Sequence, residues 1–248
     1  MKLSGNTIFI TGGTSGIGRA LAEALHKLDN QVIISGRRKA LLDEVTAANP
    51  GMKAVELDME SPESIKAVSA QLIADFPALN VLVNNAGVMH LDNAAAAVDE
   101  QMMQATITTN LMGPIRLTGA LIEHLKKQSS STVINVSSVL GFVPMAVSAV
   151  YSSTKAALHS YTMSLRWKLK DTSVRVLELS PPWVQTDLLD SKEEPRAMPL
   201  AEFIAETIDV LGTDTDEVLV ERAKDMRANP GANEYAFVNQ FNDMFVQG

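Results

Sequence analysis

The stretch that decides the fold is Thr-Gly-Gly-Thr-Ser-Gly-Ile-Gly at residues 11–18, which joins an apolar run at residues 7–11 to a helical pattern. The glycines at positions 12, 16 and 18 allow a tight turn, close approach of the backbone to a pyrophosphate, and close packing of the helix on the strand. The N-terminus of the helix then offers free N–H groups and a positive dipole end to phosphates. A glycine turn alone would be weak evidence, but a strand before it and a helix after it predict a nucleotide-binding site.

Further apolar runs recur along the chain, and helical patterns lie between them. Several runs are rich in β-branched residues and nearly continuous, which is typical of strands buried on both faces of a parallel sheet. The alternation predicts an α/β fold: a Rossmann-type, doubly wound parallel sheet with helices on both faces, in a single domain over residues 1–248. The expected strands after the first lie at residues 32–35, 53–57, 80–84, 132–136 and 174–179.

The composition excludes several classes of function. The chain has no cysteine, which removes disulfides, thiolate catalysis and cysteine-ligated metals. Its four histidines form no HExxH motif, so we expect no metal site. The net charge is 21 minus 29, or −8, without a long basic run, which argues against nucleic acid and anionic membranes as partners. Without a signal-peptide pattern or an apolar window of about 18 residues, we expect a cytoplasmic protein.

The last sixty residues are less regular. Residues 187–199 are charged and contain two prolines, and we expect a mobile loop that varies with the substrate. Residues 201–211 are predicted to be a helix and residues 218–220 a short last strand. The tail, residues 231–248, is predicted to be helical, because apolar residues fall on one face. That stripe consists of Phe237, Val238, Phe241, Met244 and Phe245.

Five motifs in order resemble those of the short-chain dehydrogenase/reductase family. The loop at residues 11–18 has the family's T-G-x-x-x-G-x-G spacing rather than G-x-G-x-x-G. The other four are Asn84-Asn85-Ala86-Gly87, Asn110 within Thr-Asn-Leu, Asn135-Val136-Ser137-Ser138, and Tyr151-Ser152-Ser153-Thr154-Lys155. Y-x-x-x-K alone could arise by chance, but five ordered motifs between residue 3 and about residue 189 are specific. The helix pattern after Lys155 and the sequence Ser180-Pro181-Pro182 look most like the DltE-type branch.

The resemblance implies four catalytic residues: Asn110, Ser138, Tyr151 and Lys155. Hydride transfer to a carbonyl leaves an alkoxide that needs a proton, and a tyrosine hydroxyl can donate it. Its pKa of about 10 must then fall toward 7, and we expect the ammonium of Lys155, four residues along the same helix face, to lower it. By resemblance, Lys155 also binds the nicotinamide ribose, Ser138 holds the substrate oxygen, and Asn110 holds a relay water. The alternative gives each residue an ordinary structural role, as a capping serine, an edge tyrosine, a surface lysine or a buried asparagine.

The end of the second expected strand sets the choice of cofactor. NAD enzymes place an acidic residue there for the ribose 2′-hydroxyl. This chain has Gly36 in that place, followed by Arg37, whose guanidinium suits a 2′-phosphate. We therefore expect NADP, with NAD still possible. The alternative reading is that Arg37 and Arg38 are solvated surface side chains.

The motifs imply a set of cofactor-binding residues. Asp58 resembles a residue that contacts adenine, although it could instead support the helix that starts after Ser61. The turn at residues 181–186 resembles the family's P-G-x-x-x-T motif, with Pro182 removing an N–H and fixing φ where glycine is usual. The full set is Gly12, Thr14, Ser15, Gly16, Ile17, Gly18, Arg37, Asp58, Met59, Asn85, Ala86, Gly87, Tyr151, Lys155, Val184 and Thr186. We expect an apolar substrate pocket lined by Phe142, Val143, Met145 and Trp183.

These residues favour an NADP(H)-dependent oxidoreductase that interconverts a ketone or aldehyde and an alcohol by hydride transfer, with Tyr151 as general acid and base. The alternatives are a non-catalytic dinucleotide-binding sensor or scaffold, and an epimerase or dehydratase of the same family. The expected partners are a small-molecule substrate and a second copy of the chain. By resemblance, a homodimer forms through the helical patterns at residues 99–127 and 151–170, with a tetramer possible. The tail is expected to lie over the body near the substrate entrance.

Overall fold

A parallel sheet forms the centre of the protein. The computed structural model describes residues 1–246, with side chains as far as Met244, and this part of the chain contains seven strands in the order β3-β2-β1-β4-β5-β6-β7. The order reverses between β1 and β4, the place where ligands bind in open α/β sheets. The strands are β1 (Thr7–Thr11), β2 (Gln31–Gly36), β3 (Lys53–Glu56), β4 (Leu79–Asn84), β5 (Ser131–Val136), β6 (Val174–Leu179) and β7 (Glu217–Val218).

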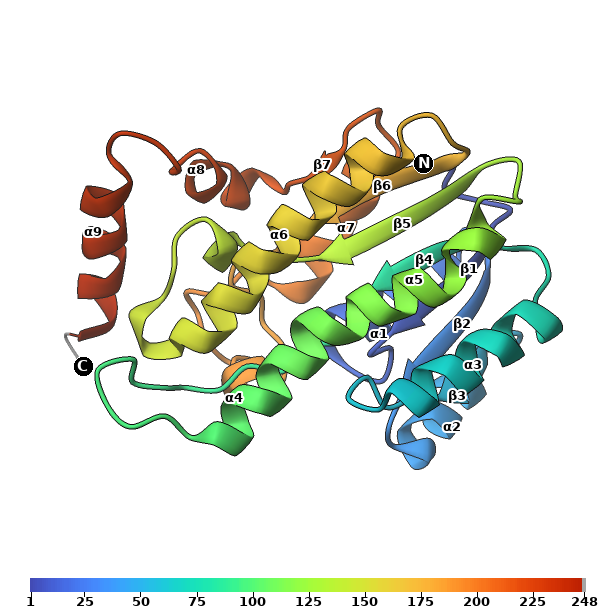
Figure 1. Cartoon of the computed structure of the whole chain (residues 1–248), viewed down its shortest axis with the longest axis horizontal. Coiled ribbons are helices and arrows are strands. Elements are labelled where there is room, and N and C mark those ends of the chain that lie inside the picture. Colours follow the sequence, from blue (N-terminus) through green and yellow to red (C-terminus); the bar gives the residue numbers. More distant parts are fainter. Residues whose placement is uncertain (247–248) are drawn as a thin grey trace.

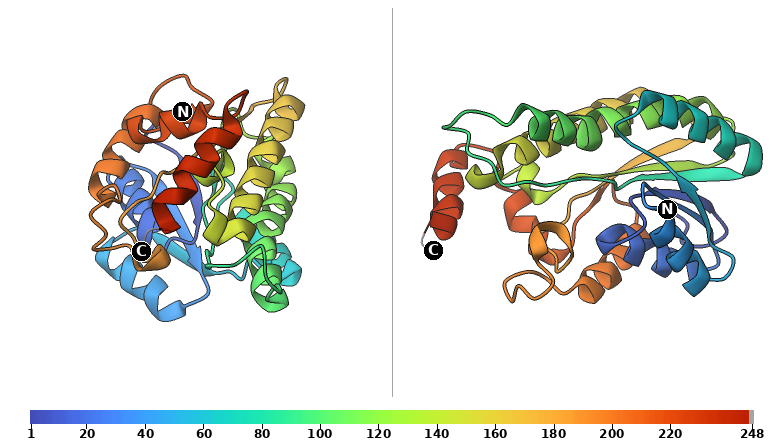
Figure 2. Two further views of the ribbon diagram at one scale, coloured as in Figure 1. Left: turned by 90° about the vertical axis from the view of Figure 1, so that its left-hand side faces the viewer. Right: turned by 90° about the horizontal axis from the view of Figure 1, so that it is seen from below.

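Helices cover both faces of the sheet, as Figure 2 shows in its right-hand view. One face packs on α1 (Gly16–His26), α2 (Lys39–Ala48) and α7 (Leu200–Leu211) around a core that includes Leu21 and Phe203. The other packs on α3 (Pro62–Asp75), α5 (Gly113–Leu125) and α6 (Ala149–Leu169) around a second core that includes Phe9 and Leu117. The predicted doubly wound sheet is confirmed, because continuous apolar strands supply side chains to both cores.

The glycine loop between β1 and α1 has the predicted geometry. Gly12 adopts φ +68°, a conformation that disfavours residues with a side chain. A Cβ atom on Gly18 would lie 2.2 Å from the carbonyl oxygen of Gly12, so only glycine lets α1 approach the loop this closely. The loop therefore holds the N-terminus of α1 at the carboxyl edge of the sheet.

The helix expected over residues 99–127 is interrupted. Asp99 caps α4 (Glu100–Ile107) by accepting a hydrogen bond from the backbone N–H of Met102, at 3.0 Å. A π-helical turn at Thr108–Met112 then separates α4 from α5. Such turns insert an extra residue and are frequent at functional sites, and this one carries Asn110.

The C-terminal region differs in detail from the prediction. The loop at residues 187–199 is fastened at its base, where Gln185 N–H donates to Met198 O (2.9 Å) and Met198 N–H donates to Trp183 O (2.8 Å). The last strand is shorter than expected, because Val220 has already turned toward α8 (Lys224–Arg227).

The predicted tail helix exists as α9 (Glu234–Val246), which stands beyond the carboxyl ends of the strands (Figure 1). Of the expected stripe, Phe237, Val238 and Phe241 are half-buried and Met244 is exposed. The side chain of Phe245 lies outside the described residues. No helix in the described part of the chain is long and apolar enough to cross a membrane.

Candidate active site

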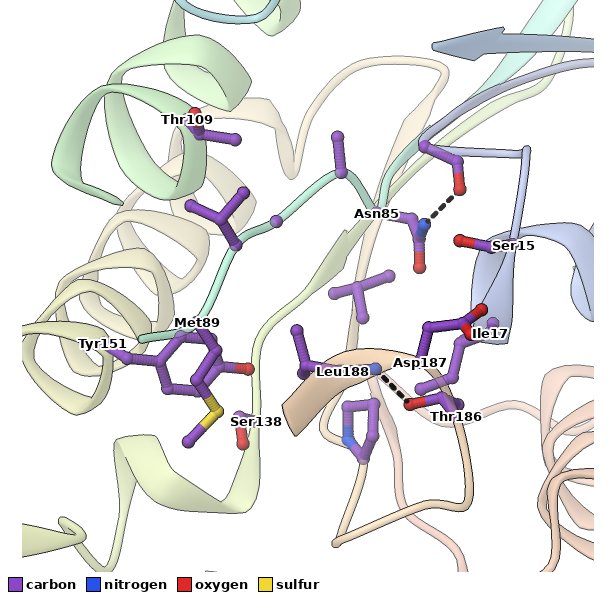
Figure 3. Close-up of a pocket in the computed structure, with 18 of the residues that line it drawn as sticks. Ser15, Ile17, Asn85, Met89, Thr109, Ser138, Tyr151, Thr186, Asp187 and Leu188 are labelled. Carbon is purple, nitrogen blue, oxygen red and sulfur yellow. Dashed lines mark hydrogen bonds between the residues drawn. The ribbon is translucent and has the colours of Figure 1, made fainter. Parts of the chain in front are cut away.

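A cleft of about 730 Å³ opens at the carboxyl ends of the strands. Every residue of the expected cofactor set lines it, and so does Ser138. Figure 3 shows Ser15, Ile17 and Thr186 at one end and Tyr151, Ser138 and Met89 at the other. One end is therefore built by the glycine loop and the other by the expected catalytic residues.

The phosphate end is held together by Thr11 and Asn85, which join the loops after β1 and β4. The hydroxyl of Thr11 accepts hydrogen bonds from the backbone N–H groups of Asn85 and Ala86, both at 3.0 Å. The amide of Asn85 donates to Thr11 O (2.9 Å) and Gly12 O (3.3 Å). The side chain of Asn85 thus shapes the loop that would receive the phosphates.

This end fits a dinucleotide on its own geometry. The first turn of a helix leaves backbone N–H groups without intrahelical partners, and the residues that begin α1, Gly16 to Gly18, line the cleft. A Cβ atom on Gly12 would lie 2.9 Å from the Cα atom of Ala86, so only glycine lets the loop after β1 lie this close to the segment after β4. Open backbone and N–H donors suit a pyrophosphate. Gly36, which carries no carboxylate, lies at the end of the cleft that would hold the adenosine.

The adenosine end carries the two arginines. The Arg37 guanidinium lies 3.2 Å from the carboxylate of Glu60, and 61% of its side chain is exposed. Both Arg37 and Arg38 line the cleft. Asp58 also lines it, while its carboxylate accepts a hydrogen bond from Glu60 N–H at 3.0 Å. The structure therefore gives Asp58 a place in the cleft and a part in the turn before α3.

The catalytic end brings three of the expected residues together. The side chains of Tyr151 and Ser138 converge in Figure 3, and the Ser138 hydroxyl is close enough to oppose the rise in the Tyr151 pKa. The Nζ atom of Lys155 lies 5.4 Å from the centre of the Tyr151 ring and donates to Val136 O at 2.9 Å. All three residues are buried. Lys155 thus holds a charge behind the tyrosine, anchored to the end of β5.

Asn110 is fully buried and does not reach the cleft with its side chain. Its Oδ1 accepts from Val88 N–H and its Nδ2 donates to Val88 O, both at 2.8 Å. This clamp fixes the segment after β4, which carries Asn85, Ala86 and Gly87. The relay water expected at Asn110 stays a prediction.

Burial dominates the proton affinities at the catalytic end. Burial raises the pKa of Tyr151 to about 12, against the opposing effect of the Ser138 hydroxyl. Burial lowers the pKa of Lys155 to about 8, against the opposing charge of Glu178. In the protein alone the Tyr151 pKa therefore rises, because desolvation of the phenolate outweighs the effect of Ser138. At neutral pH, Tyr151 keeps its proton and Lys155 stays charged.

A buried contact between His159 and Glu178, behind Lys155, was missed by the sequence analysis. His159 lies one helical turn beyond Lys155, and its Nδ1 atom is 2.7 Å from Oε2 of Glu178 on β6. Only 1% of the Glu178 side chain is exposed, and its Oε1 atom has no hydrogen-bond partner. Arg227 also faces Glu178 electrostatically while it pairs with Glu217. The spacing of Tyr151, Lys155 and His159 on one helix face was the available signal.

The substrate end agrees with the sequence only in part. Met145 and Trp183 line the cleft, but Phe142 and Val143 are buried in the protein beside it. Met226 on α8 and Phe241 on α9 line it instead. Phe241 belongs to the tail that we expected near the substrate entrance, whereas the sequence analysis did not single out Met226. Within residues 1–246, no group of three or more His, Cys, Asp or Glu side chains is placed to hold a metal ion.

The comparisons with known proteins agree with this geometry. The model of the short chain dehydrogenase family matches residues 6–197, and the chain belongs to that family. By family it is an oxidoreductase of the class that acts on CH–OH or C=O groups.

Individual relatives support the same assignment. The "Uncharacterized oxidoreductase DltE" of Bacillus subtilis is 35% identical over 98% of both chains. The 3-oxoacyl-[acyl-carrier-protein] reductase FabG of Aquifex aeolicus is 34% identical over 76% of this chain and 77% of its own length. A short chain dehydrogenase of Burkholderia cenocepacia, crystallised in complex with NADP, superimposes with a TM-score of 0.85 at 25% identity, covering 97% of this chain and 98% of its own.

The buried carboxylate of Glu178 leads to a prediction of pH dependence. Lys155 carries its charge below a pKa of about 8, and Glu178 opposes a further fall. In Glu178→Gln we expect the alkaline limb of kcat/KM for reduction to move to lower pH by roughly one unit, because the neutral amide no longer favours the ammonium. The exposed Glu202→Gln, which changes the net charge equally, should leave the limb in place. An unchanged limb in a Glu178→Gln protein that melts normally would contradict the role of Glu178.

Proposed function

We propose that this protein is an NADP(H)-dependent oxidoreductase that interconverts a ketone or aldehyde and the corresponding alcohol. The observation that carries the proposal is the buried Tyr151–Ser138 pair, backed by Lys155, at the opposite end of one cleft from the glycine cradle. Bound NADPH would supply the hydride. The family's DltE and FabG members and the hydroxy acid dehydrogenase of Schizosaccharomyces pombe, described as NADP-dependent, support this reaction class.

The chain's own residues would bind the carbonyl and deliver the proton. The hydroxyls of Ser138 and Tyr151 both face the cleft and would hold the carbonyl oxygen by hydrogen bonds, which strengthen as negative charge develops there. Tyr151 would then donate its proton to that oxygen. With a pKa of about 12 in the protein alone, Tyr151 is protonated and ready to act as an acid. The ammonium of Lys155 would stabilise the phenolate that remains.

A choice of NADP over NAD follows from the adenosine end. Gly36 offers no carboxylate to a ribose 2′-hydroxyl, and Arg37 lies in the cleft with most of its side chain exposed. The ion pair with Glu60 is exposed and therefore weak, so a 2′-phosphate can replace it. The Burkholderia structure in complex with NADP supports the same choice.

Removal of the Tyr151 hydroxyl tests the mechanism. We expect Tyr151→Phe to lower turnover in reduction by at least ~10²-fold, because the proton donor is lost, while the NADPH affinity and melting temperature stay close to those of the wild type. Tyr161→Phe, on the same helix, is the matched control and should stay active. Full activity of Tyr151→Phe would contradict the mechanism. Absence of turnover in the wild type, with NADPH bound, would favour the sensor or scaffold instead.

Replacement of Arg37 tests the choice of cofactor. In Arg37→Ala we expect NADP affinity to fall about ten- to a hundredfold and NAD affinity to change little, because only NADP carries the 2′-phosphate and a charge-assisted hydrogen bond contributes about 1.5–3 kcal/mol. Lys39→Ala removes a nearby charge that does not line the cleft and should preserve both affinities. Calorimetric titration of both cofactors gives the comparison. Equal losses for NADP and NAD would show that Arg37 is a surface residue.

We also propose that the protein forms a homodimer through the outer faces of α5 and α6. On α6, Met163 and Trp167 are 45% and 62% exposed, and they lie four residues apart on one helix face. Exposed apolar groups of this size often mark protein–protein contacts. The tail does not compete for this surface, since α9 packs at the carboxyl ends of the strands (Figure 1).

Light scattering on the pure protein checks the assembly. The expected mass is that of a dimer, and Trp167→Glu should shift it toward the monomer, because the charge would be buried in the interface. A chain shortened by residues 231–248 should remain a dimer. A stable tetramer that dissociates on this truncation would overturn the proposal, since the tail would then form a second interface.

A further inference from the structure

The part of the cleft beyond Ser138 and Tyr151 has an apolar wall. Its side chains come from four separate segments: the loop after β4, the segment before α6, the loop after β6, and the pair of C-terminal helices α8 and α9. They are Val88 and Met89, Leu140 and Met145, Trp183 and Leu188, and Met226 and Phe241. Beside this wall lie the hydroxyls of Ser138 and Tyr151, which are already assigned to the carbonyl oxygen.

No cationic side chain among the described lining residues lies beside this wall, where it could pair with an anionic substrate. Among the described lining residues, the cationic side chains are Arg37 and Arg38 at the adenosine end and Lys155 behind Tyr151. Three other cations lie near but are engaged elsewhere. Lys192 pairs with Asp187, itself a lining residue. Arg196 stacks on the ring of Trp183 at 5.1 Å and pairs with Glu194. Arg227 stacks on Phe142 at 4.8 Å and pairs with Glu217. A carboxylate or phosphate on the substrate would lose its water without gaining a cation.

Asn242 fixes the C-terminal helix to the substrate side of the cleft. The Nδ2 atom of Asn242 donates to Pro144 O at 2.9 Å, and its Oδ1 atom accepts from Ala146 N–H. Both partners flank Met145, a lining residue just upstream of α6 and Tyr151. Asn242 follows Phe241 directly, so the hydrogen bonds that hold the helix also hold Phe241 at the wall.

We propose that the substrate is an uncharged carbonyl compound whose apolar chain runs from the Ser138–Tyr151 pair toward α9, with Phe241 as a specificity-determining residue. This inference rests on the proposed function and adds the substrate class to it. In the reaction, the carbonyl carbon gains a hydride from NADPH and the oxygen gains a proton from Tyr151, which gives an alcohol and NADP⁺. Burial of each chain methylene against the wall favours binding, whereas an unpaired buried carboxylate is strongly disfavoured.

The first experiment varies charge at constant chain length. The substrates are 6-oxoheptanoate and its methyl ester, which share the same ketone and differ at the far end in a negative charge. We expect kcat/KM for the ester to exceed that for the carboxylate by at least about a hundredfold, because no cation receives the carboxylate. NADPH affinity is measured separately by titration without a ketone.

The second experiment varies the length of the ketone substrate and replaces residues of the apolar wall and of the helix that carries it. Along the methyl ketones from 2-butanone to 2-octanone, we expect kcat/KM of the wild type to rise roughly three- to fourfold for each methylene. Phe241→Ala should lose about tenfold on 2-octanone and little on 2-butanone, because only the longer chain reaches α9. Asn242→Ala should weaken the same preference by releasing the helix. Met244→Ala, on the same helix but 60% exposed, is the matched control and should keep the wild-type profile.

The outcomes separate the inference from the proposed function. A protein that binds NADPH and reduces none of these ketones overturns both. A protein that reduces the carboxylate as well as the ester overturns the uncharged substrate class and leaves the carbonyl reduction standing. A chain-length preference that is the same in Phe241→Ala and Met244→Ala overturns the assignment of Phe241.

Discussion

The hydrogen bonds between Thr11 and Asn85 are the constraint on which the rest of the site depends. They join the ends of β1 and β4, the two strands between which the sheet reverses its order. Because two crossovers leave in opposite directions there, the strand ends diverge and a cleft opens between the loops. The glycine loop, the segment after β4 and, through the Asn110 clamp on Val88, the π-helical turn all take their positions from this junction. The cofactor cradle and the catalytic residues are therefore parts of one connected framework.

Burial has two effects at the end of the cleft that holds Tyr151 and Lys155. It excludes water from Tyr151 and Lys155, and it moves their pKa values in opposite directions, toward the neutral form of each. The protein opposes the shift of Lys155 with the buried carboxylate of Glu178, which His159 holds from the same helix that carries Lys155. One helix thus carries Tyr151, the proposed proton donor, together with Lys155 behind it and His159, the partner of Glu178.

The two ends of the cleft differ in chemistry because they come from different parts of the chain. The cofactor end is built mainly from short loops after β1, β2 and β4, where backbone N–H groups and arginines are exposed. The substrate end is built from the segment before α6, the loop after β6 and the last two helices, which present apolar side chains. A fold can carry many functions when the cofactor cradle is kept and only the residues around the substrate change.

Sequence alone determined the parallel sheet and the glycine cradle, because each depends on local signals: continuous apolar strands and glycines at fixed spacing. The candidate residues Ser138, Tyr151 and Lys155 came from ordered motifs that resemble the family's, and the structure places them together at one end of the cleft. Tertiary structure decided the rest. Phe142 and Val143 were expected in the pocket but lie in the interior, and Met226 and Phe241 replace them from α8 and α9. The pKa of Tyr151 rises rather than falls, since burial is a property of the whole packed site. His159 lies on a helix and Glu178 on a strand, and no local sequence pattern predicts that these two residues come into contact. Packing between distant segments sets burial, and burial sets both the pKa values and the shape of the substrate wall.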